Sequence, residues 1–66
     1  MKVFEVFIAG GTKVTTIHAS CIEDATDIFR ESLNYETDYR ILNKVHATIK
    51  IEGYHGFMND YVVIAQ

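Results

Sequence analysis

One thiol and three imidazoles are the side chains of this sequence best suited to hold a metal or attack a substrate. His18 and Cys21 are two residues apart, as in half of a zinc site. His46 and His55 would have to complete that site from far along the chain, a spacing that matches no compact zinc module. Nothing near Cys21 suggests an oxyanion hole or an orienting base. We therefore expect no metal, no cofactor and no enzymatic activity.

Acidic side chains follow one another through a stretch that we expect to be mostly helical. Arg30 is the only cation between residues 20 and 38. A negative surface of this kind attracts and orients a partner with a basic surface. Acids early in a helix also favour its dipole, so a merely solvated helix face is the alternative interpretation. The expected partner-binding residues are Asp24, Asp27, Glu31, Glu36 and Asp38, with Glu23 at the start of the run.

A smaller group of cations alternates along a predicted strand and is followed by aromatic residues. Aromatic rings beside cations can stack a base and hold a phosphate. The alternative function is therefore a dimer that binds an anion or a nucleotide in a cleft, and the opposing interpretation is a strand whose lysines prevent sheet-to-sheet aggregation. The residues expected to line such a cleft are Lys44, His46, Lys50 and Tyr54.

The first two elements are expected to be strands of a hairpin that turns at Gly10-Gly11. A two-residue turn would place Phe4 opposite Ile17 on the core face. It would also place Phe7 opposite Val14 on the other face. That second face carries more apolar area than a solvated face needs, and so short a chain benefits from a partner subunit. We expect a homodimer through Val3, Phe7 and Val14.

The helix is predicted from Ser20 to Leu33, where Ser20 and Glu23 have the spacing of a capping box. Asn34, which tolerates a left-handed conformation, is the expected stop. The apolar side chains within this range fall at the spacing of one helical stripe. They are Cys21, Ile22, Ala25, Ile28, Phe29 and Leu33.

The rest of the chain is expected to add two strands. Residues 35–39 form a polar connection, and 41–52 alternate as one half-buried strand. Residues 53–56 are expected to turn, and 61–65 form the last strand. We predict an α+β fold of ββαββ order, with one helix covering one face of a four-stranded antiparallel sheet. The strand order in that sheet stays open, and the chain forms a single domain over residues 1–66.

Composition restricts the class of protein further. The 66 residues are 48% apolar and 23% charged, as in a folded globule, and the net charge of −3 argues against a general nucleic-acid binder. The apolar N-terminal stretch is broken by Glu5, so we expect neither a signal peptide nor a membrane span. A single cysteine fits a reducing compartment. We expect a cytoplasmic protein, in the host cytoplasm if a phage encodes it.

In size and composition the chain resembles the small accessory proteins of bacteriophages and mobile elements, which are compact, acidic and lack catalytic residues. The resemblance implies a protein that binds and disables a host or defence protein, or one that sequesters a signalling molecule. We therefore predict a protein-binding inhibitor that acts through the acidic helix face. The alternatives are the ligand-binding dimer and a structural or assembly subunit.

Overall fold

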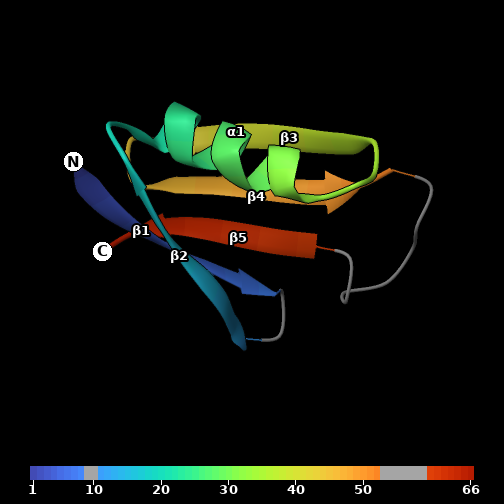
Figure 1. Cartoon of the computed structure of the whole chain (residues 1–66), viewed down its shortest axis with the longest axis horizontal. Coiled ribbons are helices and arrows are strands. Elements are labelled where there is room, and N and C mark those ends of the chain that lie inside the picture. Colours follow the sequence, from blue (N-terminus) through green and yellow to red (C-terminus); the bar gives the residue numbers. More distant parts are fainter. Residues whose placement is uncertain (9–10, 53–59) are drawn as a thin grey trace.

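A computed structural model describes residues 1–8, 11–52 and 60–66. Over these residues the chain forms an antiparallel sheet of five strands, with one helix against one side of it (Figure 1). The elements in chain order are β1 (Lys2–Ile8), β2 (Lys13–Ala19), α1 (Ile22–Ser32), β3 (Thr37–Asn43), β4 (His46–Ile51) and β5 (Asp60–Ala65). The α+β class is thus confirmed, whereas the four strands and the ββαββ order were wrong.

The extra strand arises at Asn43, inside the stretch predicted as one long strand. The Val45 backbone N–H donates to Asn43 Oδ1 at 2.9 Å. Asparagine side chains stabilise turns in this way, because they offer the backbone an acceptor that a strand ladder would otherwise supply. The chain reverses here, so that β3 pairs with β4. Residues 37–39, predicted as part of a connection, belong to β3.

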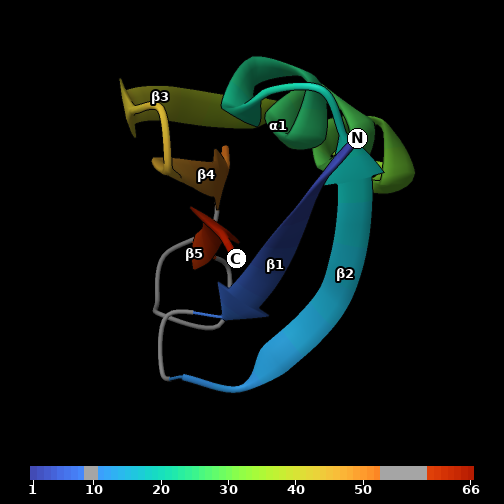
Figure 2. The ribbon, with the colours of Figure 1, turned by 90° about the vertical axis from the view of Figure 1, so that its left-hand side faces the viewer.

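The strand order in the sheet is β2-β1-β5-β4-β3. The chain first makes the hairpin β1-β2, crosses along α1 to the opposite edge, and makes the hairpin β3-β4. The last strand, β5, then lies between β1 and β4 and pairs with both. Figure 2 shows the strands as a curved layer with α1 against one side. The opposite side, called the open sheet face below, has no described helix against it.

The first hairpin follows the expected register from Val3 to Val6, including Phe4 opposite Ile17. The register then shifts, and Phe7 lies opposite Lys13 rather than Val14. Gly11 has a φ of 100°, a left-handed conformation that suits glycine, and its N–H donates to Ile8 O at 2.9 Å. Gly10 lies outside the described residues, as does the predicted turn at 53–56.

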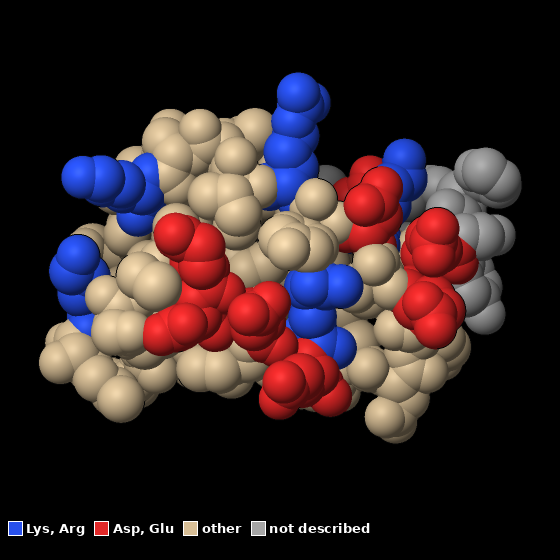
Figure 3. All heavy atoms as spheres, turned by 90° about the horizontal axis from the view of Figure 1, so that it is seen from above, with Lys and Arg blue, Asp and Glu red and all other residues tan. Residues whose placement is uncertain are grey.

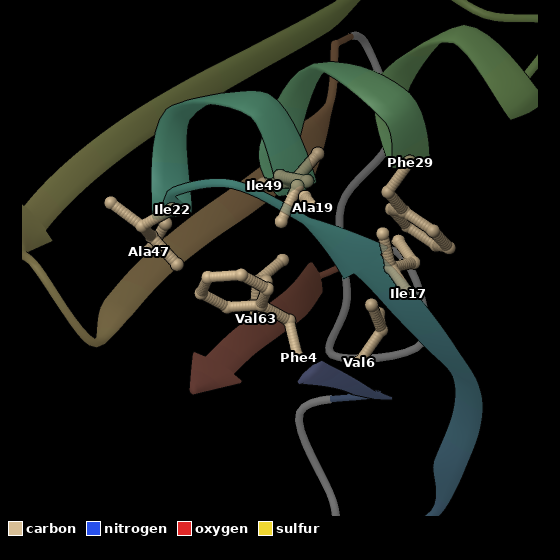
Figure 4. Packing of buried hydrophobic residues seen from close by; sticks show 10 residues of the cluster. Phe4, Val6, Ile17, Ala19, Ile22, Phe29, Ala47, Ile49 and Val63 are labelled. Atoms are coloured by element: carbon tan, nitrogen blue, oxygen red, sulfur yellow. The ribbon is translucent and has the colours of Figure 1, made fainter. Parts of the chain in front are cut away.

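The core lies between α1 and the covered face of the sheet (Figure 4). From α1, Phe29 contacts Tyr61 of β5 edge to face, with ring centroids 4.9 Å apart. Thr26 is also fully buried, because its hydroxyl donates to Ile22 O at 2.8 Å and is thereby satisfied. Ile28, predicted for this stripe, is 47% exposed. The buried cluster is Phe4, Val6, Ile17, Ala19, Ile22, Ala25, Phe29, Ala47, Ile49 and Val63.

Both ends of α1 differ from the sequence prediction. The N-cap is Cys21, with no side-chain cap hydrogen bond, so the capping box was wrong. The Ser20 hydroxyl instead donates to the carboxylate of Asp24. At the other end, the C-cap Leu33 is extended, and no described residue other than glycine has a positive φ. Asn34 therefore does not end the helix in a left-handed conformation.

Candidate functional site

The exposed side of α1 carries the acidic residues that the sequence placed there. Ile22, Ala25, Thr26 and Phe29 turn toward the sheet and are buried. With 100° between successive residues, the remaining positions other than Arg30 face outward. The exposed carboxylates on this side, called the acidic helix face below, are those of Glu23, Asp24, Asp27 and Glu31.

Arg30, the only cation of α1, points toward the sheet. Its Nε donates to Thr37 Oγ1 at 2.9 Å, and its guanidinium lies 4.0 Å from the ring centroid of Tyr39. It also pairs with Asp27 at 3.6 Å. Glu23, Asp24 and Glu31 form no ion pair within the described residues. The negative charge of the acidic helix face is thus only partly compensated.

The two remaining predicted acids lie beyond the helix, in different places. Glu36 is exposed just before β3. Its carbonyl accepts from the Glu52 N–H at 3.0 Å, so Glu52 becomes its neighbour. Sequence reasoning missed Glu52, because only the β3-β4 hairpin brings it next to Glu36. Figure 3, seen from the side of α1 and β3, shows the acidic side chains in two groups with basic side chains between them.

Asp38 does not join the acidic helix face. It lies opposite Lys50 in the β3-β4 ladder, one residue after Thr37, which contacts Arg30. Successive strand residues point to opposite faces, so Asp38 belongs to the open sheet face. Thus Asp24, Asp27 and Glu31 lie together and Glu36 adjoins them, whereas Asp38 is separated by the sheet.

The predicted self-association residues lie on or near the open sheet face. Val3 and Phe7 of β1 are half-buried there. Val14, which is 43% exposed, is no longer opposite Phe7, because the register shift puts Lys13 there. The β5 strand adds Val62, opposite Phe7, and Ile64, opposite Glu5. These two were missed because the position of β5 between β1 and β4 could not be predicted from the sequence.

The predicted ligand-binding cations are spread along β4. His46 and Lys50 lie on the open sheet face, four residues apart, and Lys44 lies in the β3-β4 turn. Tyr54 lies outside the described residues. A shallow depression near Lys50 is also lined by Arg40, Asp38 and Asp60. Carboxylates and cations are mixed there, which does not favour binding of an anion.

The thiol and the imidazoles are not gathered into one site. Cys21 is half-buried at the start of α1, and His18 is exposed on the edge strand β2. His46 is on β4, separated from β2 by two strands. His55 lies outside the described residues. Within the described ranges, no group of three or more His, Cys, Asp or Glu side chains is placed to hold a metal ion.

In the parts of the chain that the structure describes, no helix has the length and apolar character needed to cross a lipid bilayer. Comparison with known proteins found no family model, no curated protein and no solved structure that matches this chain.

Proposed function

We propose that this chain is a non-catalytic protein-binding module that docks its acidic helix face on a basic surface of another protein. The observation that supports this most is the position of Arg30. Its guanidinium is engaged by Thr37 and Tyr39 of β3 and its side chain is 28% exposed, so the only cation of the helix is partly withdrawn from the outer surface. The carboxylates are left as the dominant charges of that surface.

The spacing of the carboxylates suits a linear contact. Glu23, Asp27 and Glu31 are each four residues apart, so their Cα atoms follow one line with steps of about 6 Å. Asp24 lies beside this line. A row of Lys or Arg side chains on the partner can therefore meet several carboxylates at once. Such complementary charge speeds encounter and selects the partner.

The same proposal extends to the mode of action and the compartment. By covering a basic surface, the module acts as an inhibitor or accessory protein, of the kind that phages and mobile elements encode. It acts in a reducing cytoplasm, where the unpaired thiol of Cys21 stays free.

The test compares two variants that remove the same number and type of charges from opposite sides of the molecule. One variant carries Asp24→Asn, Asp27→Asn and Glu31→Gln on the acidic helix face. The control carries Asp38→Asn, Asp60→Asn and Glu5→Gln on the open sheet face. Each variant and the original chain are used to capture proteins from cell extract, and the retained proteins are identified and quantified by mass spectrometry.

We expect the original chain and the control to retain the same protein, one with a basic surface, and the helix variant to lose it. Far-UV circular dichroism verifies that all three chains are folded. Equal retention by all three chains would contradict the proposal, as would a loss confined to the control.

A further inference from the structure

The open sheet face has an apolar centre that runs across its middle strands. Phe7 of β1 lies opposite Val62 of β5, and Val62 lies opposite Thr48 of β4. One step along β5, Ile64 is 40% exposed between Glu5 and His46. We propose that this face binds a second copy of the chain, face to face, in a homodimer.

The charges around this apolar centre are balanced. Among the residues that the structure describes, its acids are Glu5, Asp38 and Asp60, and its bases are Lys13, Arg40 and Lys50. The balance contrasts with the acidic helix face, where two copies would repel each other. Two copies of a surface with equal numbers of both signs meet without net repulsion, whereas a strongly basic or acidic partner gains no net attraction from it.

Most of these charged side chains form no ion pair within the described residues. Glu5 and Lys13 pair at 3.0 Å, and Asp38 Oδ1 accepts from the Tyr39 backbone N–H at 3.0 Å. Arg40 and Lys50 are both exposed and form no ion pair within the described residues. Their charged groups are therefore available to carboxylates of the second copy.

The size of the face limits the area that a dimer can bury. Five strands spaced about 4.8 Å apart, each of about six residues, cover a plane of roughly 24 by 20 Å. Two such faces bury about 1,000 Å² in total, near the lower limit for a specific interface. A chain of this length buries little core by itself, so even a modest interface adds usefully to its stability. The dimer is expected to dissociate in the micromolar range.

The test uses two isoleucines of similar exposure on opposite sides of the molecule. Ile64→Lys places a charge in the centre of the open sheet face. Ile28→Lys makes the same change on α1, where Ile28 is 47% exposed. Sedimentation equilibrium from low micromolar to millimolar concentration measures the dissociation constant. We expect a dimer for the original chain and for Ile28→Lys, and a dissociation constant raised about tenfold or more by Ile64→Lys.

Arg40→Glu provides a second measurement that does not depend on a substitution in a central strand. Arg40 is exposed on the edge strand β3. The change leaves each face with two net negative charges, so it should weaken the dimer, and added salt should reduce the effect. A strictly monomeric original chain would overturn the proposal, and so would a dimer that neither Ile64→Lys nor Arg40→Glu weakens. Ile64→Lys and Arg40→Glu leave the acidic helix face unchanged, so failure here leaves the proposed function standing.

Discussion

At the scale of single residues, Asn43 lies where the chain reverses between β3 and β4. Its side chain accepts the Val45 N–H, and the chain turns within two residues between β3 and β4. A residue without a side-chain acceptor at this position would leave the Val45 N–H to solvent. Because the turn creates the β3-β4 hairpin, it also determines where Glu36, Asp38 and Glu52 lie.

We predict that Asn43→Ala lowers the free energy of unfolding by about 1 kcal/mol, the usual value of one such hydrogen bond. Asn34→Ala is the matched control, because Asn34 is exposed and its side chain forms no hydrogen bond within the described residues. Urea unfolding followed by circular dichroism measures both variants. Equal effects of the two substitutions would show that the Asn43 side chain does not stabilise the turn.

At the scale of elements, α1 is joined to β3 by Arg30 as well as by apolar packing. The guanidinium donates to Thr37 and lies over the Tyr39 ring, and both contacts come from the same edge strand. An edge strand has neighbours on one side only, so β3 depends more on such contacts than the central strands do. Arg30 thus holds β3 against α1, and through Asp27 it compensates part of the negative charge of the acidic helix face.

We expect Arg30→Ala to destabilise the fold by about 1–2 kcal/mol, through the loss of the cation–π contact and of the hydrogen bonds to Thr37. Arg40→Ala is the control, because Arg40 is exposed on the same strand and forms no ion pair within the described residues. Both variants are measured at a concentration below the micromolar range, where the proposed dimer is dissociated. Thermal unfolding of the two variants measures the difference. A loss of stability no greater in Arg30→Ala than in Arg40→Ala would contradict the role given to these contacts.

The elements differ in how well the sequence predicts them. The first hairpin and the helix depend on local patterns, so both were predicted. The predicted register of the hairpin is correct from Val3 to Val6. The break at Asn43 was missed because every second residue is apolar both before and after it, in one continuing alternation. This pattern is the same for one long strand as for two paired strands, in which Ile41 lies opposite Ala47. The central place of β5 depends on pairings with β1 and β4, which no local pattern reveals.

At the scale of the whole molecule, the two sides of the sheet carry different surfaces. The acidic helix face follows from helical periodicity alone, and its four carboxylates were predictable. The open sheet face combines all five strands, so its full extent emerges only from the strand order. An acidic side for a foreign protein and a balanced side for a second copy can act at once, because they do not overlap.

Binding through the acidic helix face is tested most directly by the salt dependence of affinity for the purified captured partner. Attraction between complementary charged surfaces weakens as ionic strength rises. We predict that the Asp24, Asp27 and Glu31 triple variant binds about tenfold more weakly at low salt and responds less to added salt. The Glu5, Asp38 and Asp60 variant should bind like the original chain. The same affinity and the same salt response in all three proteins would contradict docking through α1.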